Sequence, residues 1–531
     1  MVNRTLALAV ALAAVAPLAH AQTNTTIETQ QLRALDAWSV SALTRGEGAL
    51  SPDLWRRTDP TFLAAALERL PAAYESPAAQ ALARRVLLSG GDAPRGDAQA
   101  AARARFEALG KMGAADELAV MAAGAGAGLS DPAIAQYAAQ AELARGRRPE
   151  ACARGRSAQV GERPPAFLLR LRAYCAAVAG DRPAADLALE LAREAGAEDA
   201  WYAGAVAAAA GAPGQRQPAA RYDNSLAAQL SLAAQLRPGP NPLNNASTLA
   251  LLALARSEQT QQPLRAQAAA LAFRRGALPA LEARTILQAT PAEITSALPA
   301  IVVALRQAEA APGTLEAAGA IAGVLRAAAA PADFVSASRF FHADIAGLQN
   351  APDQAAALAF ARAAIAAEDA ALAQRLLASA RTAGVAEPAL APLDAALSAM
   401  TDIRGEAGVM AVRRRMDAGG ASLARAAARD VAILAALGAP LDGVGQIFLF
   451  ANPPQGGVRA NAGAMLAFST ALDRGAVAEA ALLAVLAVGE GGPGRLDASD
   501  LAHIVRSLRA LGLEEDARRF AVEALLAGQP G

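Results

Sequence analysis

The sequence has few of the side chains that most metal and redox sites use. Its 531 residues include two cysteines and three histidines, and only 4% of them are aromatic. Beyond residue 21 the histidines are His342 and His503, which lie far from each other and from Cys152 and Cys175 in the sequence. A zinc site needs three or four such ligands close together. We therefore expect no metal site and no bound cofactor.

An excess of charge of one sign is also missing. The 49 basic residues balance 49 acidic ones, and Lys111 is the only lysine. A protein that mainly binds nucleic acid needs a basic face, so we expect no nucleic-acid partner. The use of arginine in place of lysine is typical of GC-rich coding and favours a Gram-negative bacterium as the source.

No recognisable catalytic motif occurs. The glycine-rich residues 124–128 follow an expected helix rather than a strand, which is the wrong order for a dinucleotide-binding turn. Lys111 is not followed by Ser or Thr, so it does not complete a P-loop. His342 lies near Asp344, but no serine in a nucleophile-elbow sequence accompanies them. We predict no catalytic residues and a non-enzymatic protein.

The one long apolar run free of charge lies at the N-terminus. Residues 6–18 are apolar, Arg4 precedes them, and Ala19 and Ala21 form an A-x-A cleavage pattern. This predicts a signal peptide over residues 1–21, cleaved after Ala21, and a periplasmic mature chain. The nearest later run, residues 476–489, contains Glu479, so we expect no membrane span in the mature chain.

What the sequence does contain is a recurring helix hairpin, clearest at residues 167–196. Apolar residues at three- and four-residue spacing predict a helix on each side of Gly180. Gly180 suits a left-handed helix end, Asp181 suits an N-cap, and Pro183 suits a first helical turn. Small residues such as Ala185 let two helix axes approach closely.

The same pattern occurs 34 residues upstream, where Gly146 and Ala151 correspond to Gly180 and Ala185. A helix–turn–helix unit of this period resembles the tetratricopeptide family, whose fold is a stack of helix hairpins. The resemblance lies in the turn glycine and in the small residues of the second helix. The first helix departs from the family, because Leu169 stands where the family has an aromatic residue.

Weaker copies of the hairpin follow at irregular spacing, with turns at Gly276, Glu368, Gly475 and Gly512. Together they predict an all-α fold, an α-solenoid or superhelix of stacked antiparallel helix hairpins. An alanine-rich helical bundle, in which the matches arise from composition, is the alternative.

Proline and glycine cluster over residues 211–245, where we predict a linker with a bridging helix over 225–236. This divides the mature chain into an N-terminal helical-repeat arm over 22–210 and a C-terminal arm over 246–531. The last hairpin suits a polar capping repeat. Its expected exposed residues are Glu514, Glu515, Asp516, Arg518 and Arg519.

The two cysteines, Cys152 and Cys175, lie on consecutive expected helices that flank a loop near residues 161–164. In an oxidising compartment this placement predicts a disulfide. Two free buried thiols are the alternative.

Alanine-rich superhelical arrays also form the non-catalytic part of soluble lytic transglycosylases, and this chain is similar to that part. The catalytic Glu-Ser pair of that family precedes a Gly-Leu-Met-Gln segment. Here Glu75 and Ser76 are followed by Pro-Ala-Ala-Gln instead, so the resemblance implies no catalytic glutamate. We expect Ser76 to be a helix N-cap with Glu75 beside it.

The sequence thus favours a non-enzymatic periplasmic scaffold or adaptor that binds protein or envelope components through the surface of an α-solenoid. Its expected partners are proteins of the cell envelope. The alternative is a peptidoglycan-binding accessory to cell-wall enzymes, without a catalytic domain of its own.

Overall fold

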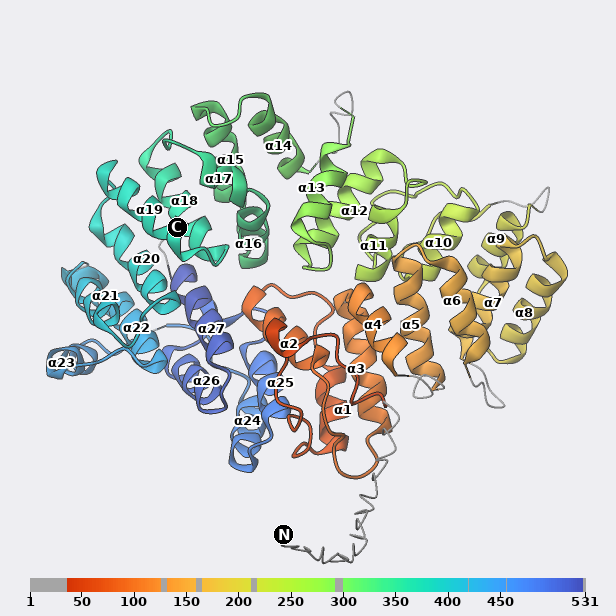
Figure 1. The fold of residues 1–531 in the computed structure, drawn as a ribbon, viewed down its shortest axis with the longest axis horizontal. Helices are drawn as coiled ribbons and strands as arrows, with labels where there is room; N and C mark the ends of the chain where they lie inside the picture. Colours follow the sequence, from red (N-terminus) through yellow and green to blue (C-terminus); the bar gives the residue numbers. More distant parts are fainter. Residues whose placement is uncertain are drawn as a thin grey trace, which may run out of the picture. The chain divides into compact units, whose positions relative to one another are not determined.

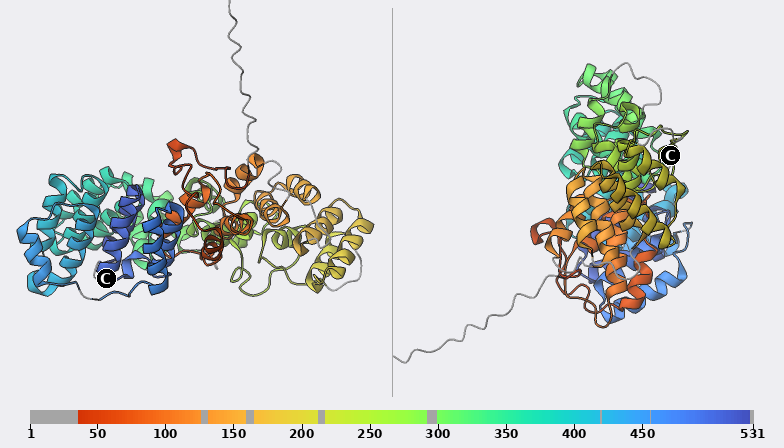
Figure 2. Two further views of the ribbon diagram at one scale, coloured as in Figure 1. Left: turned by 90° about the horizontal axis from the view of Figure 1, so that it is seen from below. Right: turned by 90° about the vertical axis from the view of Figure 1, so that its right-hand side faces the viewer.

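The computed structural model describes residues 36–125, 131–158, 165–211, 217–291, 299–418, 420–454 and 456–528. The predicted signal peptide, the loop near residues 161–164 and part of the glycine-rich run 124–128 lie outside these ranges. Within them every regular element is a helix, apart from one isolated bridge between Val458 and Leu496 (Figures 1 and 2). The predicted all-α fold of successive packed helix pairs is confirmed.

The helices of the first half are η1 (Arg45–Glu47), α1 (Pro60–Glu68), α2 (Pro77–Leu88), α3 (Gln99–Met112), α4 (Ala115–Gly124), α5 (Pro132–Ala144), α6 (Arg148–Ser157), α7 (Ala166–Val178), α8 (Arg182–Glu194), α9 (Ala200–Ala209), α10 (Ser225–Ala233), α11 (Thr248–Arg256) and α12 (Gln262–Arg274). Those of the second half are α13 (Ala280–Gln288), α14 (Ala300–Ala310), α15 (Leu315–Ala327), α16 (Pro331–Phe340), α17 (His342–Gly347), α18 (Gln354–Ala366), α19 (Ala370–Thr382), α20 (Glu387–Met400), α21 (Glu406–Asp417), α22 (Gly420–Leu437), α23 (Gly443–Ala451), α24 (Ala462–Arg474), α25 (Val477–Val488), η3 (Pro493–Arg495), α26 (Ala498–Ala510) and α27 (Glu514–Ala527). No helix in the described part of the chain is both long enough and apolar enough to span a bilayer.

The hairpin of α7 and α8 forms as the sequence predicts. Gly180 ends α7 in the left-handed conformation, with φ +78°, and its N–H donates to Ala177 O. Asp181 then caps α8 by accepting a hydrogen bond from Ala184 N at 3.1 Å. Ala185 is 1% exposed, so it lies in the helix contact where a small side chain was expected.

Alanine supplies much of the buried surface in two hydrophobic clusters. The larger cluster contains residues from Ala37 to Leu526 and so includes both ends of the described chain. The smaller one draws on residues 135–236, from α5 to α10. Helix α10 lies inside the predicted linker, and the division of the chain into two arms stays a prediction.

An irregular segment opens the described chain and packs on α3 through Arg105. The guanidinium of Arg105 donates to Leu87 O and Ala37 O, each at 2.8 Å, and lies over the rings of Trp38 and Trp55. Burial lowers the pKa of Arg105 to about 9. A planar group with five N–H donors can bind several carbonyls at once, which holds this segment against α3.

Helix α2 also packs against α25 and α27, which come from the opposite end of the sequence (Figure 1). Arg85 of α2 forms an ion pair with Asp516 of α27. Asp516 is 1% exposed, so the expected surface position of this residue is wrong. Helix α27 lies against α2, α20, α22 and α26 rather than ending the chain as an open polar cap.

The two cysteines lie on neighbouring helices. Cys152 of α6 and Cys175 of α7 are joined by a disulfide in the structure, with their Cα atoms 6.0 Å apart. The bond closes a loop between residues 23 apart in the sequence.

We expect thiol titration of denatured, non-reduced protein to find no free thiol, and of reduced protein to find both. Reduction should lower the free energy of unfolding by about 3 kcal/mol in the chain-entropy account of a loop this long. The double variant Cys152→Ser/Cys175→Ser should lose the response to reductant. Two free thiols in the non-reduced sample would show that the expected pairing is wrong.

Candidate functional site

A cavity of about 820 Å³ lies where α2 meets α16, α18 and α27. The segment around η3 and Met400 at the end of α20 complete its wall. The volume is within the range of cavities that enclose small ligands or short peptide segments.

Much of the cavity wall is apolar. Ala78 and Ala81 of α2, Phe334 of α16, Ile365 of α18 and Val522 of α27 line it. Such side chains give a ligand's apolar groups a surface to pack against and leave orientation to a few polar groups.

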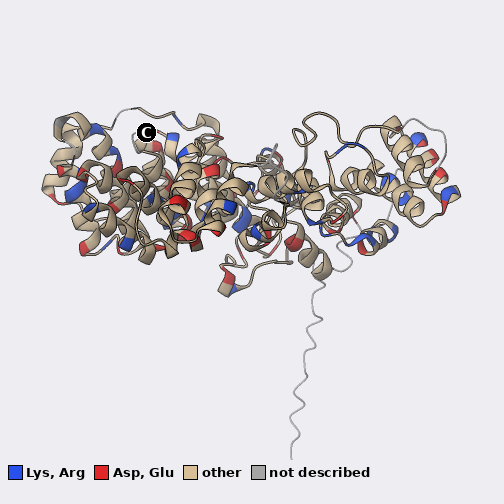
Figure 3. Cartoon of the chain, turned by 90° about the horizontal axis from the view of Figure 1, so that it is seen from above, with Lys and Arg blue, Asp and Glu red and all other residues tan. Residues whose placement is uncertain are grey.

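Charged side chains of both signs line the rest of the cavity. The arginines are Arg339, Arg362, Arg495, Arg518 and Arg519, and the glutamates are Glu75, Glu368, Glu490, Glu515 and Glu523. Basic and acidic residues are interspersed along the helices of the described chain as well (Figure 3). The cavity combines these charges with a partly apolar wall.

Glu368 holds two helices together at one side of the cavity. Its Oε1 accepts a hydrogen bond from Arg339 Nη2 of α16 at 3.2 Å, and its Oε2 accepts one from Arg519 Nη2 of α27 at 3.1 Å. Arg519 also pairs with Glu515 one turn earlier on α27, at 2.6 Å. The carboxylate of Glu368, in the turn between α18 and α19, therefore connects α16 to α27.

The backbone of Glu368 is in the left-handed region, with φ +63°. The turn between α18 and α19 has the same hydrogen bonds as the turn at Gly180, because Glu368 N donates to Ile365 O and Asp369 N to Ala364 O. A residue with a Cβ is less stable than glycine in this conformation by about 1–2 kcal/mol. Backbone strain of this kind is often found at functional sites, so Glu368 marks the cavity as a candidate.

Arg362 of α18 extends over the ring of Phe334, with its Cζ 4.4 Å from the ring centroid. Its Nε is buried and has no hydrogen-bond partner among the described residues. Burial lowers the pKa of Arg362. A buried polar group without a partner is unfavourable, so the hydrogen bonding of this guanidinium is incomplete in the structure.

Glu523 of α27 also lines the cavity and lies against the N-terminus of α2. Its Oε2 accepts a hydrogen bond from Ala78 N at 2.8 Å, while Ser76 caps the same helix through Ala79 N at 3.1 Å. Burial raises the pKa of Glu523 to about 7, and the N–H of Ala78 and the Ser76 side chain oppose that rise in part. The carboxyl therefore changes charge near neutral pH.

Within the described residues the cavity has more unpaired cations than unpaired anions. Arg362, Arg495 and Arg518 form no ion pair there, and among the lining glutamates only Glu490 and Glu523 lack one. Because Glu523 is partly neutral near pH 7, the balance favours positive charge. An arrangement of this kind can bind and orient an anionic group.

The residues that sequence reasoning singled out lie partly at this site. Ser76 caps α2 as expected, and Glu75 beside it pairs with Arg274 at 3.0 Å. His342 Nε2 is 2.9 Å from Asp369 Oδ2, rather than paired with Asp344. The cysteines lie on α6 and α7, which do not line the cavity. In the described part of the chain no three His, Cys, Asp or Glu side chains form a group that could hold a metal ion.

The sequence analysis did not identify Arg362 or Glu523 as site residues, because no nearby sequence pattern distinguishes them. Glu368 is different, because it occupies the turn position at which Gly276, Gly475 and Gly512 lie in the other predicted hairpins. A charged residue at a turn position that favours glycine is the pattern that could have indicated the site.

The strain at Glu368 can be measured with two substitutions. Glu368→Ala and Glu368→Gly both remove the link to Arg339 and Arg519, but only glycine also relieves the left-handed backbone. We expect the alanine variant to be less stable than the glycine variant by about 1 kcal/mol in denaturant unfolding. Equal stabilities would show that position 368 is not strained.

The pH response of Glu523 is a second test. Since folding raises the pKa of this carboxyl above its ordinary value, its contribution to stability is complete at acidic pH and is lost as the pH rises through about 7. Glu523→Gln keeps an acceptor for Ala78 N–H without the charge. The free energy of unfolding of this variant should rise relative to wild type by about 1–3 kcal/mol between about pH 5 and about pH 8.

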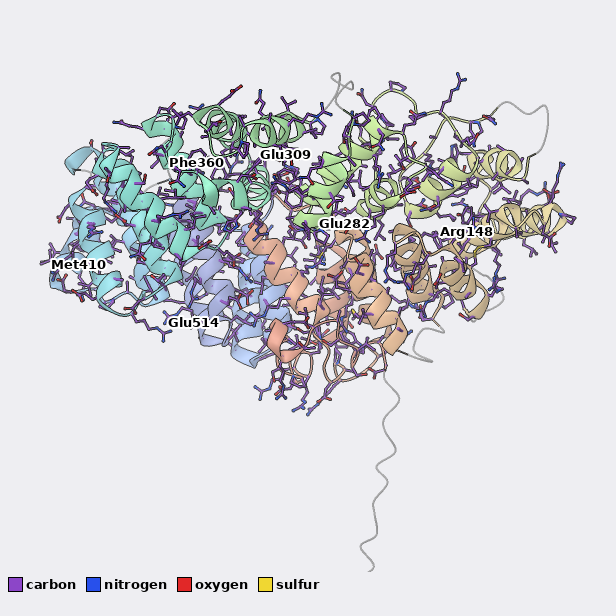
Figure 4. All side chains as sticks on the ribbon, turned by 45° about the horizontal axis from the view of Figure 1, so that its top comes forward. Arg148, Glu282, Glu309, Phe360, Met410 and Glu514 are labelled. Carbon is purple, nitrogen blue, oxygen red and sulfur yellow. A yellow bond between two sulfur atoms is a disulfide. The ribbon has the colours of Figure 1, made fainter. Side chains whose placement is uncertain are left out.

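The matched control is Glu514→Gln, which removes a more exposed carboxylate from the same helix (labelled in Figure 4). It should show a much smaller change over the same pH interval. If the free energy of unfolding of Glu523→Gln changed with pH in the same way as that of wild type, the burial of the Glu523 charge would be contradicted.

Comparison with known proteins identified no similar protein. No protein-family model matches the chain, and neither a curated protein nor a solved structure matches it. The similarity to tetratricopeptide proteins and to the superhelical part of lytic transglycosylases therefore rests on the sequence positions given above.

Proposed function

We propose that this chain is a non-enzymatic binding protein of the cell envelope, and that a segment of a partner protein enters the cavity between α2, α16, α18 and α27. The observation that supports this is the cavity itself, which combines an apolar wall with charged groups that are not all paired. A peptide segment has the matching mixture of apolar side chains, amide groups and charges.

The cavity is also suited to a stable binding role because distant parts of the chain hold its walls. Glu368 connects α16 to α27, and Arg85 connects α2 to α27. Walls held in this way lose little freedom when a ligand binds, which favours affinity.

Site-specific photo-crosslinking in cells of the source organism tests this proposal. A benzoylphenylalanine at position 329, an exposed alanine at the cavity wall, should crosslink to a defined protein. The same group at the exposed Ala378 of α19 should not, because that residue lies outside the cavity.

A blocking variant makes the test specific. Ala81→Trp places a large side chain in the cavity and should abolish the crosslink from position 329, whereas Ala378→Trp should leave it unchanged. Crosslinks that survive Ala81→Trp would contradict entry into the cavity. Co-sedimentation with isolated peptidoglycan, lost in Ala81→Trp and accompanied by no protein crosslink, would favour a glycan-binding accessory instead.

A further inference from the structure

We propose that the cavity recognises an acidic peptide segment by binding one of its carboxylates to the guanidinium of Arg362, with Arg495 and Arg518 supplying further positive charge. This inference rests on the proposed function and specifies the chemical class of the ligand. It follows from how the charges of the cavity are paired, from the environment of Arg362 and from the acidic residues that remain.

Three arginines of the cavity wall have no ion-pair partner among the described residues. Glu368 and Glu515 are engaged with Arg339 and Arg519, and Glu75 is engaged with Arg274 from outside the cavity wall. The three other arginines of the wall have no carboxylate partner among the described residues. A ligand that brings a carboxylate would restore the balance of charge.

Arg362 is the best placed of these arginines for direct recognition. One face of its guanidinium lies over the Phe334 ring, which restrains the plane of the group. Its Nε is buried and has no hydrogen-bond partner among the described residues. A carboxylate can bind a guanidinium through two parallel N–H···O bonds, which are stronger than the bonds that a neutral amide makes.

The apolar part of the wall, rather than charge, selects among anions. Glu490 and Glu523 line the same cavity without an arginine partner, but they are outnumbered by the three unpaired arginines. A phosphate group carries nearly twice the charge of a carboxylate, so it loses more hydration on entering a partly apolar cavity. The apolar wall at Ala81, Ile365 and Val522 further favours a ligand whose carboxylate is flanked by apolar groups, as in a peptide.

Calorimetric titration of the purified full-length chain with short capped alanine–leucine peptides tests the inference. The peptides carry a central glutamate, glutamine, arginine or phosphoserine and are otherwise identical. We expect the glutamate peptide to bind at least about tenfold more tightly than the glutamine peptide, as loss of one charge-assisted contact implies. The arginine and phosphoserine peptides should bind more weakly than the glutamate peptide.

Substitutions test whether the preference for the glutamate peptide arises in the cavity. Arg362→Gln should reduce the glutamate-over-glutamine preference to near one, and Arg518→Gln should reduce it in part. Arg182→Gln removes the same charge from α8, outside the cavity, and should leave the preference unchanged. Thermal unfolding of each variant checks that the fold is intact, and Arg518→Gln provides a second measurement where Arg362→Gln destabilises the chain.

The outcomes separate this inference from the proposed function. Equal binding of the glutamate and glutamine peptides, abolished by Ala81→Trp, would overturn the carboxylate inference and leave a peptide-binding cavity. Tighter binding of the phosphoserine peptide would overturn the choice of anion. Binding of soluble muropeptides that depends on Arg362, with no peptide bound, would overturn both proposals, and so would the absence of any binding.

Discussion

Close contact between helices that carry short side chains is the constraint on which this structure depends. Ala173 of α7 and Ala205 of α9 are fully buried, as are many other alanines of both clusters. Helices that pack this closely must reverse direction in a tight turn, and a left-handed residue provides it. Gly180 adopts the left-handed conformation without strain. Glu368 adopts it with strain, but its carboxylate then lies between α16 and α27.

The local parts of the fold were predictable from the sequence, because their signals lie within a few residues. The turn at Gly180, the cap at Asp181 and the small residue at Ala185 all formed as expected. The cavity was not predictable, since the walls come together from residues hundreds of positions apart. Asp516 shows why: its neighbours in sequence suggest an exposed polar helix, and only the distant Arg85 explains its burial.

The charges around the cavity have two different structural roles. Glu368 and Arg519 satisfy each other, so they contribute to the position of the helices and need no ligand. Arg362 is held over Phe334 with an unsatisfied N–H, so its position is fixed while its hydrogen bonding is incomplete. Arg105 illustrates the contrast, because five backbone carbonyls satisfy its fully buried guanidinium. Burial of an arginine is therefore not by itself a sign of function in this chain, and Arg362 differs from Arg105 in lining the cavity without a carboxylate partner.

The packing of α2 on α27 joins segments made at very different times during synthesis. The hydrogen bond between Ala78 and Glu523 spans 445 residues of sequence. Chains emerge from the ribosome N-terminus first, so α2 exists long before the helix that covers it. Until α27 is complete, the apolar face that α2 later buries against it stays open to water and to other chains, and a product truncated before α27 would keep that aggregation-prone surface permanently.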